Sequence, residues 1–358
     1  MAEGKPIQVS YHCFKIRKQS GGYRTISAPN PELKEVQNTI YKALMRLGIG
    51  AGPLLHAYVR HRSIKTMAQS LQIRDDEGTP RTPHYMLKID IKDFFPSLTK
   101  KVVMEACKKA RVPAYYWNLV GSYCFQYDEK RGEWILPQGS PASPFLSNLV
   151  MRQAAARING VVKSWNRSKH FLTKFAAYCD NLAFTADDPA IVALIYPTER
   201  ILKTYGLVLN KEKIRFLKAP ARKEVCGVVM SDHTAPRKEY WRMLRAQLFN
   251  ALVDVRAGHA PPGFCLTPEA RKKIREDAGI LGKEGYKRKI TNGEGDRIPI
   301  PWGEWKGRIS FVTMLHPEKG KQLAMMLADL EKETEKCRNR KLSLESASVS
   351  TSGSPTEK

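Results

Sequence analysis

Two short, apolar stretches of β-forming residues each carry an aspartate where a strand ends or turns. In MLKIDI (86–91) the residue is Asp90, and in KFAAYCDNLAFTA (174–186) it is Asp180, which begins an Asp-Asn pair typical of a hairpin turn. Pro96 ends regular strand pairing soon after the first stretch. A strand end and a hairpin turn on one antiparallel sheet can bring two carboxylates side by side. The pattern therefore allows a paired-carboxylate site at the edge of such a sheet.

The charge balance indicates a polyanionic partner. The 358 residues include 60 Lys and Arg against 35 Asp and Glu, a formal net charge of +25. A single aspartate in a turn is commonly a cap or a hydrogen-bond acceptor. In a chain this basic the pair gains meaning, because phosphoryl transfer to a nucleic-acid end needs carboxylates that gather Mg²⁺. Two such ions roughly 3.5–4 Å apart can activate the attacking hydroxyl and stabilise the leaving pyrophosphate.

Several other classes of protein are disfavoured. The seven cysteines are an odd number, and no two stand at C-x-x-C spacing, which argues against a disulfide framework and a structural zinc site. No stretch approaches the roughly 18 consecutive apolar residues of a membrane span. The first 20 residues contain no apolar core of a signal peptide. We therefore expect a cytoplasmic protein without a membrane partner.

Periodicity along the chain predicts the order of its elements. A hairpin is expected over 11–28, and a Pro/Gly-rich loop leads into a helix within 136–160. Further helices are expected over 31–47, 64–72, 98–111, 113–127 and 188–205, and further strands at LVLN (207–210), KIRFLKAP (213–220) and EVCGVVMSD (224–232). From residue 236 to about 335 the pattern is helical, interrupted only at 291–304. Residues 336–358 end in a Ser-rich segment without a core pattern and are predicted to be a disordered tail.

The motifs around the aspartates resemble those of a known family. DIKDFFPS (90–97), LPQGSPASPFLSN (136–148) and AYCDN (177–181) stand in the order of the palm motifs of reverse transcriptases, and they resemble those of bacterial retron reverse transcriptases. Further blocks resemble the retron type in the same order, and together they cover about 300 residues: YRTISAP (23–29), HRSIKTMA (61–68), LNKEKIRF (209–216), EVCGVVMSD (224–232) and WKGRISFVTMLHPEKGKQL (305–323).

The resemblance implies a fold of the α+β class, a right-hand polymerase that closes around a primer–template duplex. Residues 1–85 would form the fingers, and 86–235 an antiparallel-sheet palm with part of the fingers. Residues 236–335 would form a helical, RNA-binding thumb.

The resemblance also assigns roles around the two aspartates. Asp90, Asp180 and Asn181 would be the catalytic, metal-holding group, with the backbone carbonyl of Ile91 as a further ligand and two Mg²⁺ ions as cofactor. Phe95 matches the aromatic gate that lies under the sugar of the incoming nucleotide and excludes a 2′-hydroxyl. The same residue is otherwise explained as a core phenylalanine.

Four further positions match nucleotide contacts of the family. Arg24 would bind the triphosphate through its guanidinium, although a solvated surface arginine is the alternative. Gln138 and Gly139 lie in the loop whose polar groups would meet nucleotide and template, unless it is a simple Pro/Gly turn. Lys213 falls where the family has a lysine near the leaving pyrophosphate.

Primer and RNA contacts are expected downstream. Cys226 and Gly227 occupy the place of the retron V-T-G signature, near where the primer end would rest. Tyr240, Trp241 and Arg245 begin a segment in which aromatic and basic residues alternate, which could hold structured RNA by stacking and phosphate contacts. A solvated helical face is the alternative.

Three motifs depart from the family pattern. Asn181 stands where the metal motif has a second aspartate, and its neutral side chain weakens Mg²⁺ binding while keeping the shape of the turn. It is either a natural variant or a deliberately introduced inactivating change. In SIKTMAQSL, Met67 and Leu71 stand where retron enzymes carry Asn and, nearby, His. Cys226 replaces the threonine of V-T-G.

The resemblance implies a retron-type, RNA-directed DNA polymerase that copies part of its cognate noncoding RNA into single-stranded DNA. Synthesis would start from a guanosine 2′-hydroxyl and serve antiphage defence with an effector protein. After the expected thumb only a short tail remains, so an RNase H of the host would remove the RNA. Two alternatives stay open, namely another small bacterial reverse transcriptase, of the abortive-infection or diversity-generating type, and a catalytically dead RNA-binding scaffold.

Overall fold

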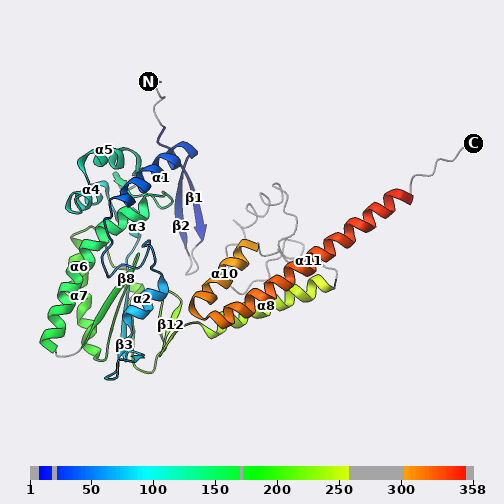
Figure 1. Ribbon diagram of the computed structural model, residues 1–358. Helices are drawn as coiled ribbons and strands as arrows, with labels where there is room; N and C mark the ends of the chain where they lie inside the picture. The colour runs from blue at the N-terminus through cyan, green and yellow to red at the C-terminus, as the bar shows by residue number, and fades with distance from the viewer. Residues whose placement is uncertain (1–7, 18–21, 170–171, 258–301, 352–358) are drawn as a thin grey trace, which may run out of the picture. The chain divides into compact units, whose positions relative to one another are not determined.

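The computed structural model describes residues 8–17, 22–169, 172–257 and 302–351. The chain divides into two compact units, Met1–Ala235 (unit 1) and Pro236–Lys358 (unit 2), each of which is described by itself (Figure 1). The division falls where the sequence predicts the thumb to begin. Within the described ranges, no helix has both the length and the apolar character that crossing a membrane requires.

A four-stranded antiparallel sheet lies at the centre of unit 1. Its strands are ordered β10-β5-β9-β8, with bounds β5 Tyr85–Asp90, β8 Lys174–Tyr178, β9 Asn181–Ala186 and β10 Arg215–Leu217. In β5, Met86, Leu87 and Ile89 are all buried, so both faces of the strand are covered. This burial explains why the strand reads as a nearly continuous apolar run, and it fixes β5 as a central strand that ends at Asp90.

Helices cover the sheet and form the core with it. They are α1 Pro31–Arg46, α4 Lys100–Lys109, α5 Ala114–Tyr123, α6 Ser143–Lys169 and α7 Ile195–Lys203. Local sequence fixes where α1 begins, because the Asn30 side chain accepts a hydrogen bond from the Leu33 amide at 2.8 Å and Pro31 occupies the first turn. Leu33, Ile40 and Leu44 then form the buried stripe of the helix. The helices predicted over 31–47, 98–111 and within 136–160 are confirmed, whereas the one predicted over 113–127 ends at Tyr123, because Gln126 and Tyr127 pair with another strand.

Smaller elements surround this core. They are the sheets β1 Tyr11–Arg17 with β2 Tyr23–Pro29, β3 Ile73–Arg74 with β4 Pro80–Arg81, β6 Gln126–Asp128 with β7 Glu133–Ile135, and β11 Lys223–Val225 with β12 Val228–Met230 and β13 Thr234–Pro236, together with the helices α2 Ile64–Leu71 and α3 Phe94–Ser97 and the short 3-10 turns η1 Pro189–Leu194 and η2 Lys211–Lys213. The predicted hairpin over 11–28 is confirmed as β1 and β2, and α2 begins with the Ser63–Thr66 capping box.

Unit 2 contains three described helices. They are α8 Lys238–Arg256, α10 Trp302–Leu315 and α11 Pro317–Thr351. Their shared core is apolar and includes Leu244, Leu248, Trp305, Val312 and Leu323. Residues 258–301 of the predicted helical segment lie outside the described residues, and with them most of the interruption expected at 291–304. Residues 302–304 do not interrupt the helical pattern, because they begin α10.

Three expectations about local structure are wrong. The helix predicted over 188–205 is split into η1 and α7. Pro197 has no backbone N–H, so it cannot donate the hydrogen bond that would join the two segments into one α-helix. The strand predicted at LVLN is reduced to one bridge, between Leu209 and Ile91, since β5 has already ended at Asp90. Residues 336–351, predicted to be disordered, belong to helix α11, whose apolar face packs on α8 and α10, while 352–358 lie outside the described residues.

Candidate active site at the end of the central strands

The register of the sheet brings the predicted metal-motif residues together. Asp90, the last residue of β5, lies directly opposite Asn181, the first residue of β9. Asn181 also pairs with Tyr178 of β8, so Cys179 and Asp180 form the two-residue turn between these strands. The turn predicted at Asp180-Asn181 is thus shifted by one residue. Cys179 has a φ of 56°, in the left-handed region that tight hairpin turns require.

Backbone hydrogen bonds fix this end of the sheet. The Ile91 amide donates to the carbonyl of Asp180 at 2.9 Å, and the Asn210 amide donates to the carbonyl of Asp90 at 2.8 Å. Ile91 is buried and forms the bridge with Leu209. The two aspartates are therefore held by main-chain geometry, while the proposed ligand role of the Ile91 carbonyl stays a prediction.

The side chains at this end carry closely spaced charges. The Lys213 ammonium lies 3.0 and 3.3 Å from the two carboxylate oxygens of Asp90, whose side chain is only 15% exposed. The Asn181 amide donates to Oδ1 of Asp180 at 3.0 Å. Burial, and next the charge of Asp90, raise the pKa of the Asp180 carboxyl, whereas Lys213 and Arg24 lower it. An additional cation at this site would therefore stabilise the ionised forms of the two carboxylates.

The donor set suits Mg²⁺. Asp90 and Asp180 offer carboxylate oxygens, and such hard ligands are the ones that Mg²⁺ prefers. The Lys213 ammonium already bridges both oxygens of Asp90 as a cation does. In the described part of the chain, no group of three or more His, Cys, Asp or Glu side chains is arranged to hold a metal. Asp90 and Asp180 therefore offer two carboxylates to a divalent cation, and the neutral Asn181 side chain beside them adds no negative charge.

Phe95 follows Asp90 by five residues and is only partly buried. Asp93 has a φ of 44°, and this left-handed residue starts the short helix α3. The two phenylalanines that follow are treated differently, since Phe94 is buried in the core while Phe95 is half-buried. Their ring centroids are 5.3 Å apart. Phe94 is part of the core, and Phe95 packs against the same core with part of its ring exposed, so its role as the aromatic gate stays a prediction.

Strand β2, which carries Arg24, makes a close backbone contact with the loop at Gln138-Gly139. The Ser27 amide of β2 donates to the carbonyl of Gln138 at 2.9 Å. Gly139 has a φ of 145°, and a Cβ there would lie 2.4 Å from the carbonyl oxygen of Ser27. Only glycine fits at this position. Arg24 is exposed on the same strand, and its charge reaches Asp180. The structure therefore joins the predicted nucleotide contacts of the hairpin and the loop.

The predicted primer contact lies in another two-residue turn. Cys226 and Gly227 connect β11 to β12, with φ values of 48° and 81°. Both residues are left-handed, as a type I′ turn requires. Burial raises the pKa of the Cys226 thiol to about 12, and the charge of Asp180 acts in the same direction. The turn thus lies within electrostatic reach of the carboxylate site.

Tyr58 belongs to this region and was not identified from the sequence. It lies three residues before the HRSIKTMA block, and its hydroxyl donates to Sγ of Cys179 at 3.5 Å. Burial raises the pKa of the Tyr58 hydroxyl above its usual range, so the side chain is neutral. The matched motif begins at His61, so it gives no signal for Tyr58. The departures Met67 and Leu71 are explained, because both are fully buried on α2.

The candidates in unit 2 are less exposed than expected. Tyr240 packs edge-on against Phe311 at 5.4 Å between ring centroids, and the Lys319 ammonium lies 5.2 Å from the ring centroid of Trp241. Both aromatic residues border the core of the helices, whereas Arg245 is exposed. This packing favours a structural role for the two rings, and their predicted contact with RNA stays a prediction.

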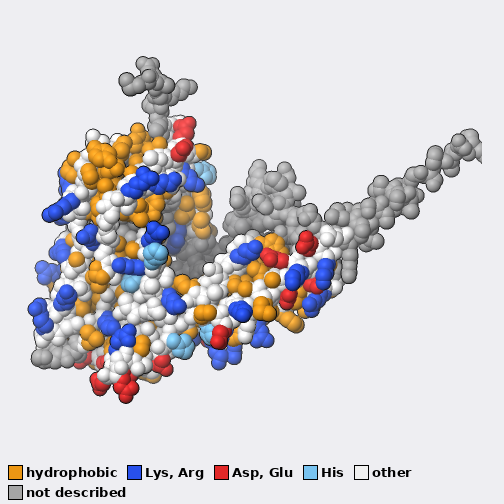
Figure 2. Space-filling model, in the orientation of Figure 1, with side chains coloured by type: hydrophobic (Ala, Val, Ile, Leu, Met, Phe, Trp, Pro, Cys, Tyr) orange, Lys and Arg blue, Asp and Glu red, His pale blue; other side chains and the backbone are white. Residues whose placement is uncertain are grey.

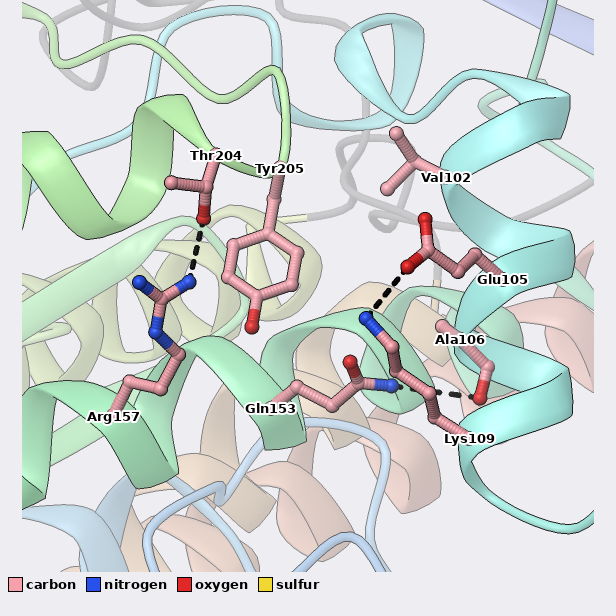
Figure 3. A pocket seen from close by; sticks show the side chains of 8 residues that line it. All are labelled: Val102, Glu105, Ala106, Lys109, Gln153, Arg157, Thr204 and Tyr205. Carbon is pink, nitrogen blue, oxygen red and sulfur yellow. Dashed lines mark hydrogen bonds and ion pairs between the residues drawn. The ribbon is translucent and has the colours of Figure 1, made fainter.

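A pocket of about 150 Å³ lies elsewhere in unit 1, between α4, α6 and the end of α7 (Figure 3). Arg157 donates to the Thr204 hydroxyl at 2.7 Å, and Lys109 pairs with Glu105 at 2.6 Å. The lining side chains therefore satisfy one another, and none of the predicted site residues is among them. On the face drawn in Figure 2, Lys and Arg side chains are spread over both units.

Comparisons with known proteins agree on one family. The reverse transcriptase (RNA-dependent DNA polymerase) family matches residues 16–243. The chain is 26% identical to the Retron Ec83 reverse transcriptase of Escherichia coli over 231 residues, which are 62% of this chain and 69% of that protein. It is 25% identical to the Retron Mx162 reverse transcriptase of Myxococcus xanthus over 351 residues, which are 90% of this chain and 61% of that protein.

Solved structures give weaker likenesses. A telomerase from Candida albicans in complex with the TWJ fragment of telomeric RNA aligns with a TM-score of 0.44 at 11% identity, covering 92% of this chain and 62% of that one. A foamy viral protease-reverse transcriptase in complex with double-stranded DNA aligns with a TM-score of 0.37 at 14% identity, covering 86% and 43%. The assignment rests on the sequence matches, and the chain belongs to the reverse transcriptase family, as a retron-type RNA-directed DNA polymerase of the α+β class.

Proposed function

We propose that this chain synthesises DNA on an RNA template at the carboxylate end of β5 and β9. The observation that carries the proposal is the register that sets Asp90 opposite Asn181, with Asp180 in the adjoining turn. Asp90, Asp180 and the carbonyl of Ile91 would hold two Mg²⁺ ions. These ions would activate the primer hydroxyl and stabilise the leaving pyrophosphate.

The surrounding residues would bind and orient the nucleotide. Arg24 would bind the triphosphate, and Lys213 would neutralise charge near the pyrophosphate, since both cations act on the carboxylates. Gln138 and Gly139 would contact nucleotide and template from the loop joined to β2. Phe95 would exclude the 2′-hydroxyl of a ribonucleotide through its partly exposed ring. Cys226 and Gly227 would support the primer end.

The natural template is proposed to be a cognate, structured noncoding RNA. The retron names of the relatives and the net charge of +25 support this proposal. Synthesis would start from a guanosine 2′-hydroxyl of that RNA and give a single-stranded DNA joined to it. In the cytoplasm, a host RNase H would remove the copied RNA, and an effector protein would use the product in antiphage defence. Unit 2, with Arg245 exposed on α8, would act as a thumb that holds RNA.

Asn181 is proposed to weaken catalysis. A carboxylate at this position would add a negative charge beside Asp180, where the amide now donates a hydrogen bond. Because divalent cations are held largely by charge, we expect Asn181→Asp to raise DNA synthesis by at least about tenfold. A primer-extension assay in which the Asn181 form is as fast as the Asn181→Asp form would contradict this expectation.

The test of the function is to express the chain in bacteria and sequence the nucleic acid that copurifies with it. The Asn181→Asp form and an Asp90→Ala form of it are prepared in parallel. One RNA species, with covalently joined DNA in the Asn181→Asp form alone, supports retron synthesis. A linear or protein-joined DNA would instead indicate an abortive-infection or diversity-generating type of enzyme. Heterogeneous RNA without DNA in any form would contradict the proposal.

A second candidate is a scaffold that binds RNA without copying it. The observation that favours it is the amide of Asn181 in place of a carboxylate. A scaffold should be indifferent to Asp90→Ala in its cellular role, whereas an enzyme should lose that role. Both candidates predict that RNA affinity falls steeply with salt, so the Asp90→Ala comparison distinguishes them.

A further inference from the structure

The loop between α1 and α2 carries an exposed aromatic residue into the site. Its path is fixed by backbone contacts, because the His56 amide donates to the carbonyl of Ala177 on β8 at 2.9 Å. The Asn148 side chain of α6 donates to the carbonyl of Ala57 at 2.9 Å. Arg62 donates to the carbonyl of Leu55 at 2.7 Å. Strand β8, helix α6 and Arg62 of the loop itself therefore hold the three residues that immediately precede Tyr58.

Tyr58 itself is held in a costly conformation. Its φ is 58°, in the left-handed region that non-glycine residues rarely adopt. Its side chain remains 46% exposed, although it is a large aromatic residue. Strained backbone that persists because its surroundings are rigid is concentrated at functional sites. The strain and the exposure together indicate that this ring is kept available for a ligand.

The contacts of Tyr58 point to the nucleotide. Its hydroxyl donates to Sγ of Cys179, the residue that precedes Asp180 in the turn. The centroid of its ring lies 6.4 Å from that of Phe95, with the planes inclined at 52°. The two rings thus lie beside each other, one joined to the metal-motif turn and the other at the place proposed for the sugar gate.

We propose that Tyr58 is a specificity-determining residue of the nucleotide site and forms, with Phe95, a two-ring wall against the deoxyribose of the incoming nucleotide. This inference rests on the proposed function. The hydroxyl proton of Tyr58 is already used by Cys179, so the wall offers apolar ring surface and little to replace the water around a 2′-hydroxyl. It therefore accepts the CH₂ of a deoxyribose and disfavours the polar group of a ribose. The hydrogen bond couples the position of the wall to the turn that carries Asp180.

The test compares Tyr58→Phe, which keeps the ring, with Tyr58→Ala, which removes it, in the Asn181→Asp form. Tyr196→Ala is the matched control, since Tyr196 is 67% exposed on α7 and is not among the site residues. The readouts are KM and kcat for dNTPs and rNTPs, the stability of the ternary complex formed with a 3′-terminated primer, and the melting temperature.

The ring-deleting variant should show the larger effect. We expect Tyr58→Ala to lower the dNTP-to-rNTP ratio of kcat/KM about tenfold or more, mainly by raising the dNTP KM, and to weaken the dNTP ternary complex to a similar extent. Tyr58→Phe should lower the ratio about threefold, as loss of one hydrogen bond would. Cys179→Ala should match Tyr58→Phe, and combining the two should add nothing further.

Contrary results have separate meanings. If the Asn181→Asp form extends primers while the folded Tyr58 variants keep the dNTP-to-rNTP ratio and the ternary complex of the Tyr196→Ala control, the inference is wrong and the proposed function stands. If the Asn181→Asp form extends no primer and binds no dNTP on a primed template, the inference about Tyr58 and the proposed function are both overturned.

Discussion

In unit 1, the residues around Asp90 and Asp180 are positioned by backbone hydrogen bonds and tight turns, whereas in unit 2 the helices are held together by large buried side chains. Four non-glycine residues near the site have left-handed φ values, and these are Tyr58, Asp93, Cys179 and Cys226. The described helices of unit 2 contain no such residue, and their core is centred on Trp305 and leucines. The comparison teaches that the candidate site residues lie where several backbone contacts fix the main chain, whereas unit 2 depends on the packing of its helices.

Removal of the central side chain of unit 2 is the largest expected effect on stability. Trp305 is 1% exposed and is the largest fully buried side chain among the described residues. Trp305→Ala should destabilise the chain by about 3–5 kcal/mol, because the cavity cannot be filled by neighbouring helices. Denaturant unfolding monitored by hydrogen exchange checks this, and the loss of protection should be concentrated in α8, α10 and α11. Equal loss in β5 and β9 would show that the two units do not differ in this way.

A backbone change should be the most damaging one near the site. Gly139→Ala places a Cβ against the Ser27 carbonyl and in a disallowed φ region, at a cost of about 2–4 kcal/mol. We expect the loop to leave β2, which raises the dNTP KM of the Asn181→Asp form while the helices of unit 2 keep their protection. Gly160→Ala on α6 is the control, since a Cβ there meets no atom within 4 Å. An unchanged KM in Gly139→Ala would break the argument.

Acid should loosen unit 1 through His56. Burial, and next the charge of Arg62, lower the pKa of this histidine to about 4 from its usual value near 6.5. The unfolded chain therefore binds a proton more readily between these pH values, so stability is full above about pH 6.5 and decreases as pH falls toward 4. The loss attributable to His56 should reach about 3 kcal/mol. Urea unfolding from pH 7 to pH 4 measures it, and His56→Gln should flatten that part of the profile.

The smallest predicted effect is a gain. Cys226 adopts a φ of 48° in the β11–β12 turn, a conformation that glycine adopts without steric cost. We expect Cys226→Gly to stabilise unit 1 by up to about 1 kcal/mol and to leave unit 2 unchanged. The measurement is the denaturation midpoint, with Cys13→Gly on the exposed strand β1 as a destabilising comparison. A decrease in stability for Cys226→Gly would mean that its side chain contributes packing that outweighs the strain.

Much of the local structure could be predicted because it depends on short stretches of chain. The cap at Asn30, the buried stripe from Leu33 to Leu44 and the apolar run of β5 are each encoded within one segment. Prediction failed where distant contacts decided the result. The LVLN segment lost its strand because β5 ends at Asp90, and residues 336–351 continue helix α11, whose packing on α8 and α10 no single segment reveals.

The sequence by itself determined which residue types are available for chemistry. It identified Asp90, Asp180 and Asn181 by motif, the Gly139 loop by composition, and the family by the order of its blocks. Such patterns are local in the chain, so they can be recognised without knowing the tertiary contacts.

Only the tertiary structure decided how these groups meet. Strand register set Asp90 opposite Asn181, and it moved the turn to Cys179-Asp180. Burial separated Phe94 from Phe95, and contacts of the preceding residues with β8 and α6 fixed Tyr58 beside Phe95. The physical reason is that register, burial and the position of a strained loop depend on residues far apart in sequence, and the free energy of those contacts exists only once the chain has folded.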